Sequence, residues 1–178
     1  MPSPIKKITL LALGLISGSL AKSLKSQDFS GEIVAWGRRS GSLEKGVALG
    51  VIDRYSLDLA EAIAGADVVV IATPTLIAAD MIGQLAALSK QGLLDPKTII
   101  TDVASVKGNL LQAAKDAFGE VPANLVLGHP IAGSEKSGVE AAKADLFVDH
   151  RVILTPTEET DGDALLTIRH LWESTGAE

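Results

Sequence analysis

Apolar residues occur along this chain in two alternating patterns, short continuous runs and longer stretches where they recur every three or four positions. A continuous run of a few apolar residues is typical of a parallel strand that is buried on both faces. The sequence therefore predicts strands at residues 5–12, 32–36, 67–72, 97–101, 125–127 and 151–154, with one more short strand introduced by Val51-Ile52.

The spaced apolar positions indicate amphipathic helices between these strands. We expect helices at residues 15–27, 42–49, 57–63, 77–88 and 106–118, and a last one after Asp161. Ser56 and Asp161 are expected to cap two of them, because their side-chain oxygens can accept first-turn N–H groups. The buried face of the helix at 106–118 is predicted to carry Val106, Leu110, Ala114 and Phe118.

Strands and helices alternate over residues 1–178 without an internal linker, a repeat or a low-complexity segment. Crossovers between parallel strands are right-handed and place helices against the sheet. The expected fold class is therefore α/β, a single domain with a doubly wound, mostly parallel Rossmann-type sheet and helices on both faces.

Composition limits the classes of partner and the cellular compartment that we expect for this chain. Aromatic residues make up only 3% and the net charge is −6, which argues against a nucleic-acid partner. There is no cysteine, and His129, His150 and His170 have no metal-ligand spacing, so we expect no metal site. We expect a cytoplasmic protein without a membrane partner.

A competing interpretation is a secretory leader, because Lys6-Lys7, the apolar run at 8–16 and the small residues at 17–21 imitate a signal peptide.

The first strand-to-helix turn reads Ala12-Leu13-Gly14-Leu15-Ile16-Ser17-Gly18-Ser19. Against the dinucleotide fingerprint G-x-G-x-x-G, the middle glycine is present as Gly14, while Ala12 and Ser17 take the first and third positions. A glycine there lets a pyrophosphate approach the helix N-terminus, where Leu15 and Ile16 begin the helix. The alternative is a tight turn that binds no ligand.

The end of the second strand indicates which dinucleotide is bound. An NAD site usually has an acidic residue here for the ribose 2′-hydroxyl. This chain instead has Gly37-Arg38-Arg39-Ser40, and two guanidinium groups with a hydroxyl suit a 2′-phosphate. We therefore expect NADP as cofactor in preference to NAD. The alternative is an ordinary solvated basic turn.

A loop at residues 128–138 follows the strand at 125–127 and carries the strongest candidate chemistry. It places His129 and Glu135 among three glycines at a strand end, where open α/β sheets bind their ligands. Imidazole titrates near neutral pH, so His129 is the candidate proton acceptor. The alternative is a glycine-rich surface loop with a solvated histidine.

Three segments give the chain a specific resemblance: Ala72-Thr73-Pro74, Thr101-Asp102-Val103-Ala104-Ser105-Val106-Lys107 and Gly128-His129-Pro130-Ile131-Ala132-Gly133-Ser134-Glu135. In this order and spacing they resemble the prephenate/arogenate dehydrogenase family of tyrosine biosynthesis, over essentially the whole chain. The turn at Ala12 and Ser17 departs from the family, which usually has glycine at both positions.

The resemblance implies an NADP-dependent oxidative decarboxylation of prephenate or arogenate. It implies that His129 accepts the proton of the substrate hydroxyl, with Ser105 between the histidine, that hydroxyl and the nicotinamide. It also implies that Glu135 gates the substrate pocket through an ion pair, and that Thr73 and Pro74 contact the cofactor. Asp102 and Lys107 are expected to order the loop, and His150 and His170 to lie at the surface.

Members of the family continue into a helical domain that supplies a substrate-binding arginine and most of a homodimer interface. Because this chain stops at Glu178, we expect it to be the nucleotide-binding half, mainly monomeric and without turnover of its own. Two other functions stay open, a non-catalytic nucleotide-binding module and a dehydrogenase of the β-hydroxyacid type.

Overall fold

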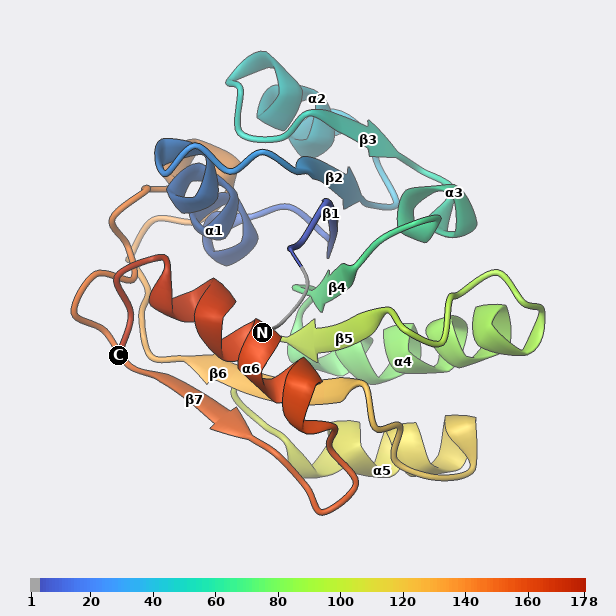
Figure 1. Cartoon of the computed structure of the whole chain (residues 1–178). Coiled ribbons are helices and arrows are strands. Elements are labelled where there is room, and N and C mark those ends of the chain that lie inside the picture. Colours follow the sequence, from blue (N-terminus) through green and yellow to red (C-terminus); the bar gives the residue numbers. More distant parts are fainter. Residues whose placement is uncertain (1–3) are drawn as a thin grey trace.

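The computed structural model describes residues 4–178 and forms a sheet with helices on both sides (Figure 1). The strands are β1 Lys7–Leu11, β2 Glu32–Trp36, β3 Arg54–Ser56, β4 Val68–Ile71, β5 Ile99–Asp102, β6 Leu125–Pro130 and β7 Val152–Thr155. The helices are α1 Leu15–Ser26, α2 Gly41–Ala48, α3 Leu59–Ile63, α4 Thr75–Lys90, α5 Gly108–Phe118 and α6 Gly162–Glu173, with a 3₁₀ turn, η1, at Val139–Ala141.

The seven strands are ordered β3-β2-β1-β4-β5-β6-β7. The pairs from β3 to β6 are parallel, and β7 pairs antiparallel with β6 at the sheet edge. From β1 the chain adds β2 and β3 on one side and then β4, β5 and β6 on the other, which is the strand order of a doubly wound sheet. The predicted α/β class is confirmed, and the predicted strand at 151–154 is present as β7 at the sheet edge.

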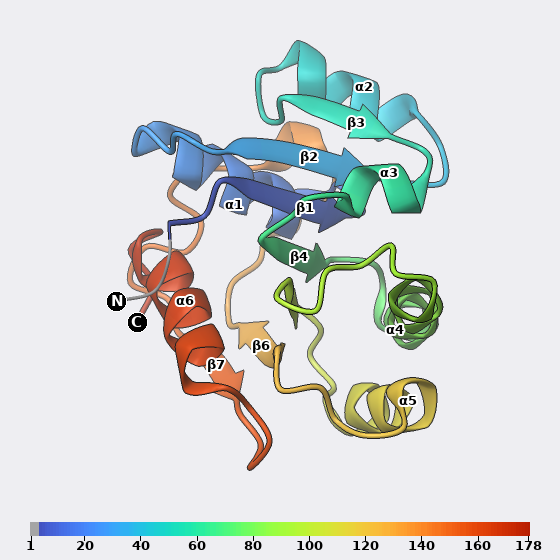
Figure 2. The ribbon, with the colours of Figure 1, turned by 45° about the vertical axis from the view of Figure 1, so that its right-hand side comes forward.

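Two apolar cores lie on opposite faces of the sheet. One is built from α1, α6 and the η1 segment, with Leu20, Phe147 and Trp172 among its buried side chains. The other is built from α3, α4 and α5, and includes Met81 and Leu110. Figure 2 shows α1 and α6 on one side of the strands and α4 and α5 on the other. Helices on both faces are therefore confirmed.

Two local predictions were wrong. The helix after β3 is capped by Asp58, whose carboxylate accepts the Ala60 N–H at 3.1 Å, whereas Ser56 ends the strand and accepts the Asp58 N–H. Val106 is 53% exposed, because α5 begins only at Gly108 and leaves Val106 in the preceding loop. The predicted cap at Asp161 is confirmed, since its carboxylate accepts the Ala164 N–H at 2.9 Å.

The segment that imitates a signal peptide forms β1 and α1, and its apolar residues Ile8, Leu11 and Leu20 are fully buried in the sheet and its cover. This burial explains its apolar composition. No helix in the described range 4–178 has the length and apolar character needed to cross a bilayer.

Candidate functional site

The carboxyl ends of four parallel strands lie level with one another. Leu11 of β1 pairs with Trp36 of β2 and Ile71 of β4, and Ile71 pairs with Asp102 of β5. The loops that follow these strands therefore leave the sheet from one edge, which we call the carboxyl edge. Every candidate segment of the sequence lies in or beside these loops, at the edge where open α/β sheets bind ligands.

The phosphate turn at this edge has an unusual internal structure. Ala12 adopts a left-handed backbone with φ of 79°. The Ser17 hydroxyl donates to the Ala12 carbonyl at 2.9 Å and accepts the Gly14 N–H at 3.1 Å. Gly14 is the N-cap of α1, and no atom lies within 4 Å of the place where a Cβ would stand. The turn is thus closed by a side chain and left open above Gly14, which fits an approaching pyrophosphate.

Close packing at the start of α1 depends on Gly18. A Cβ on Gly18 would stand 3.0 Å from the Ala142 Cβ, so the segment around η1 lies directly on this helix. The Ser19 hydroxyl accepts the Lys143 N–H at 3.0 Å, and Lys22 Nζ donates to the Ala142 carbonyl. The loop that follows His129 therefore returns across the molecule and anchors on the phosphate-binding helix.

The basic turn after β2 is open to solvent. Arg38 and Arg39 are exposed, and neither forms an ion pair with any other residue of the described range. Ser40 is the N-cap of α2, and its hydroxyl makes no capping hydrogen bond. Two guanidinium groups, a hydroxyl and a helix N-terminus are therefore free to bind a phosphate group.

The catalytic candidates lie on the other side of the carboxyl edge. His129 is half-buried near the end of β6, and Ser105 is exposed in the loop after β5, the neighbouring strand. In residues 4–178 no hydrogen bond joins the two side chains. Glu135 is exposed in the loop beyond β6. The fold thus gathers Ser105 and His129 at adjacent strand ends, whereas Glu135 is left at the surface.

A buried ion pair supports the peptide next to His129. Asp102 is fully buried, accepts the N–H groups of Gly128 at 2.9 Å and Ala104 at 3.1 Å, and pairs with Lys107 Nζ at 2.6 Å. Lys107 Nζ also donates to the Gly128 carbonyl. Burial raises the pKa of the Asp102 carboxyl and lowers the pKa of the Lys107 ammonium, against the mutual attraction of the pair. The expectation that these two residues order the loop is confirmed.

Thr73, one of the predicted cofactor-binding residues, has a hydroxyl group without a hydrogen-bond partner in residues 4–178. The Thr73 hydroxyl, just after β4, is buried without a hydrogen-bond partner in the described structure. A buried hydroxyl normally has a partner, so a bound ligand at this edge can supply it. Pro74 is exposed and is the N-cap of α4. His150 and His170 are exposed, as expected.

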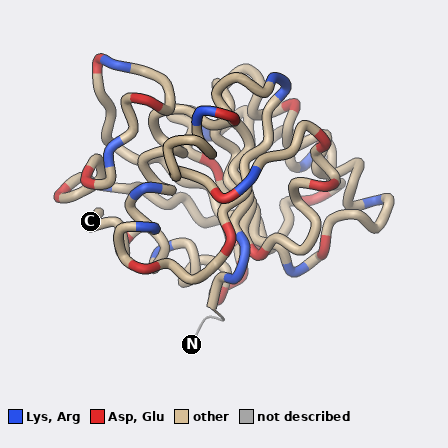
Figure 3. Tube along the Cα trace, turned by 90° about the horizontal axis from the view of Figure 1, so that it is seen from above, with Lys and Arg blue, Asp and Glu red and all other residues tan. Residues whose placement is uncertain are grey.

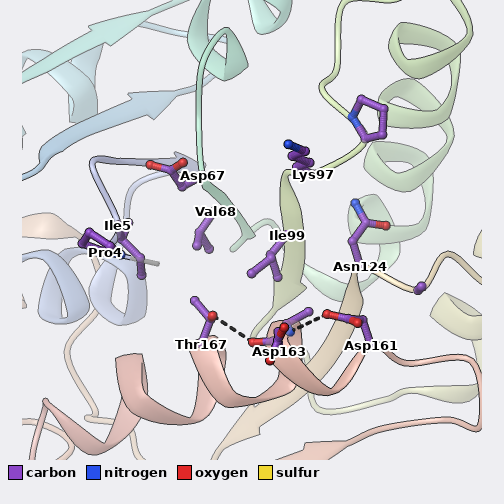
Figure 4. Close-up of a pocket in the computed structure, with 13 residues that line it drawn as sticks. Pro4, Ile5, Asp67, Val68, Lys97, Ile99, Asn124, Asp161, Asp163 and Thr167 are labelled. Atoms are coloured by element: carbon purple, nitrogen blue, oxygen red, sulfur yellow. Dashed lines mark hydrogen bonds between the residues drawn. The ribbon is translucent and has the colours of Figure 1, made fainter. Parts of the chain in front are cut away.

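A cavity lies elsewhere, at the opposite edge of the sheet. It has a volume of about 660 Å³, and its lining includes Asp67 and Lys97, which precede β4 and β5 (Figure 4). Asp161 and Asp163 of the α6 N-terminus face it from below. None of the site residues predicted from the sequence lines this cavity. Figure 3 shows that acidic and basic residues are mixed along the described part of the chain.

The fold and the carboxyl edge define a dinucleotide-binding domain of the Rossmann type. A family model, "Prephenate dehydrogenase, nucleotide-binding domain", matches residues 20–178. The chain belongs to this family.

Similar proteins carry related names. The prephenate dehydrogenase of Bacillus subtilis is 34% identical over 96% of this chain and 44% of its own length. The cyclohexadienyl dehydrogenase of Zymomonas mobilis is 30% identical over 96% of this chain and 56% of its own. The crystal structure of Aquifex aeolicus prephenate dehydrogenase in complex with hydroxyphenyl propionate and NAD+ superposes with a TM-score of 0.86, at 32% identity, over 97% of this chain and 58% of that one. This chain thus spans about half the length of its relatives.

Proposed function

We propose that this chain is the cofactor-binding part of an enzyme that performs the NADP-dependent oxidative decarboxylation of prephenate or arogenate. The observation that carries the proposal is the single carboxyl edge, which gathers the phosphate turn, the basic turn and His129 of the parallel neighbour β6. Membership of the prephenate dehydrogenase family supports it. The names of similar structures, a prephenate dehydrogenase and an arogenate dehydrogenase, supply the two substrate candidates.

The cofactor would lie along the carboxyl edge. The first-turn N–H groups of Leu15 and Ile16 would bind its pyrophosphate above Gly14, and Thr73 and Pro74 would line the far side. Gly37 would let the ribose approach, while Arg38, Arg39 and Ser40 would bind a 2′-phosphate. When bound, the nicotinamide supplies a hydride acceptor next to the ends of β5 and β6.

His129 would accept the proton of the substrate hydroxyl as hydride leaves the carbon that carries this hydroxyl. Ser105 would donate or accept a hydrogen bond between the imidazole and that hydroxyl. Loss of the ring carboxylate as carbon dioxide then completes aromatisation, so the protein needs one base and no external oxidant beyond the cofactor. Glu135 would gate the substrate pocket through an ion pair.

The cofactor preference is tested by calorimetric titration of NADP and NAD. We expect NADP to bind more tightly, and Arg38→Ala or Arg39→Ala to weaken NADP by about 1.5–3 kcal/mol each while leaving NAD nearly unchanged. Arg169→Ala is the control, because Arg169 is an exposed arginine on α6 that pairs with Glu173. Equal affinities for the two cofactors, or tighter NAD binding, would contradict the proposed preference.

The catalytic part is tested by substrate-dependent cofactor reduction. We expect residues 1–178 to fold as a monomer by light scattering, to bind NADP and to show no turnover. Positioning of a substrate can supply about 7–11 kcal/mol of a barrier, and this chain matches a nucleotide-binding domain and spans about half the length of its relatives. In a longer chain that turns substrate over, His129→Asn should reduce turnover at least about a hundredfold with cofactor affinity retained. Near-normal turnover in that variant would exclude His129 as the base.

A non-catalytic nucleotide-binding module is the second candidate. The departure of the phosphate turn from the glycine fingerprint at Ala12 and Ser17 favours it. Tight cofactor binding with no turnover in the longer chain would establish it.

A further inference from the structure

The two positions where the phosphate turn departs from the glycine fingerprint, Ala12 and Ser17, are in direct contact. The Ser17 hydroxyl donates to the Ala12 carbonyl at 2.9 Å. It also accepts the N–H of Gly14, the glycine that the turn retains, at 3.1 Å. A single buried side chain, 1% exposed, therefore bridges both ends of the turn.

Ala12 needs this support. Its φ of 79° lies in the left-handed region, which glycine enters freely and alanine resists because of its Cβ. Its own N–H donates to the Trp36 carbonyl at 2.8 Å, which fixes only one side of the residue. The Ser17 hydrogen bond fixes the carbonyl on the other side.

We propose that Ser17 is a positioning residue for dinucleotide binding, which holds the alanine-containing turn in its ligand-ready conformation and so replaces the two missing glycines. This inference rests on the proposed dinucleotide site. Because Ser17 already occupies the Gly14 N–H, Gly14 contributes space and not a hydrogen bond. The pyrophosphate contacts then fall to the N–H groups of Leu15 and Ile16, which have no partner within the helix.

The consequence is an energetic coupling between residues 12 and 17. Without the hydroxyl, Ala12 relaxes toward negative φ in the free protein, and a ligand must restore the turn as it binds. With glycine at position 12 the left-handed backbone has no such cost, and the hydroxyl becomes dispensable. The serine hydroxyl at position 17 and a glycine at position 12 are thus alternative solutions to the same problem.

The test is a double-mutant cycle of Ala12→Gly and Ser17→Ala, titrated with NAD, NADP and 2′-AMP. We expect Ser17→Ala to weaken NAD and NADP by about fivefold in the parent, the range for one neutral hydrogen bond, and by less than about twofold in the Ala12→Gly background. Binding of 2′-AMP, which has no pyrophosphate, should stay unchanged. Ser23→Ala is the control, since Ser23 is equally buried on α1 and lies away from the turn.

Equal losses in both backgrounds, or an equal loss for 2′-AMP, would overturn the inference. A second variant guards against poor folding of Ser17→Ala: Ala12→Gly combined with Ser17→Gly restores G-x-G-x-x-G and should bind NAD and NADP as tightly as the parent. Weak binding by this folded variant would also overturn the inference. The ratio of NADP to NAD affinity tests the proposed cofactor preference separately, because Ser17 affects both cofactors alike.

Discussion

The two sides of the carboxyl edge are stabilised by different forces. On the nucleotide side, at the ends of β1 and β2, the turn is held by the neutral hydroxyl of Ser17. On the catalytic side, at the ends of β5 and β6, the main chain is held by the Asp102–Lys107 ion pair. A fixed carboxylate beside the phosphate turn would repel an anionic ligand, so a neutral group is the compatible choice there.

The catalytic side has a different requirement, which follows from unequal strand lengths. β5 pairs with β6 only as far as Thr101 and Val126, while β6 continues to Pro130. Gly128 therefore lacks a main-chain partner on that side, and the side chains of Asp102 and Lys107 take its N–H and carbonyl instead. The loop carrying Ser105 can then leave the sheet, and the peptide before His129 stays fixed.

The largest expected effect is the loss of this ion pair. Lys107→Met removes the cation and leaves Asp102, which has no exposed surface, without its counter-charge. We expect a loss of about 3 kcal/mol in the free energy of unfolding, measured by urea denaturation, because an uncompensated buried charge is costly.

Lys45→Met is the matched control. Lys45 forms an equally short ion pair with Glu140, but the two side chains are 62% and 53% exposed. Its loss should change the free energy of unfolding little, because solvent screens an exposed ion pair. Similar losses for the two variants would show that Asp102 and Lys107 behave as an ordinary surface pair, and the contrast between the two sides of the edge would fail.

A smaller effect is expected on the nucleotide side. Ala12→Gly relieves a left-handed alanine and should raise the free energy of unfolding by about 1 kcal/mol. Asp28→Gly is the comparison, since Asp28 also has a positive φ of 59°, but aspartate tolerates this region and should gain less. A loss of stability in Ala12→Gly would mean that the turn is not strained.

The sequence predicted which loops meet at the carboxyl edge, but it did not predict the side-chain hydrogen bonds that hold these loops. Apolar runs place β1, β2 and β4, and parallel pairing then brings their following loops to one edge. The bond from Lys107 to Gly128 joins residues 21 positions apart, so local periodicity does not contain it. The helix α5 begins only after Lys107, which is its N-cap, so a helical pattern that included Val106 gave the wrong start. Nothing in the order Ala12 to Ser17 indicates that the serine hydroxyl closes the turn.

The smallest expected effect is a pH dependence that separates two carboxylates. Burial raises the pKa of Asp102 despite the hydrogen bonds from Lys107, Gly128 and Ala104. Burial also acts to raise the pKa of Asp53, but hydrogen bonds from Lys25 and the Ile33 N–H outweigh it and lower the pKa. The two groups should therefore contribute to stability with opposite slopes in acid.

The signs follow from proton binding. Folded Asp102 holds its proton more tightly than the unfolded chain does, so its contribution to the free energy of unfolding falls as pH rises above the ordinary carboxyl pKa of about 3.9. Folded Asp53 holds its proton less tightly, so its contribution is present above that pKa and is lost as pH falls through the lowered folded value. Urea denaturation of the parent, Asp102→Asn and Asp53→Asn between about pH 3 and 6 measures both. The parent's advantage over Asp102→Asn should shrink with rising pH, and its advantage over Asp53→Asn should grow. Slopes of the same sign would show that the Asp102 carboxylate gains more from Lys107 than burial takes away.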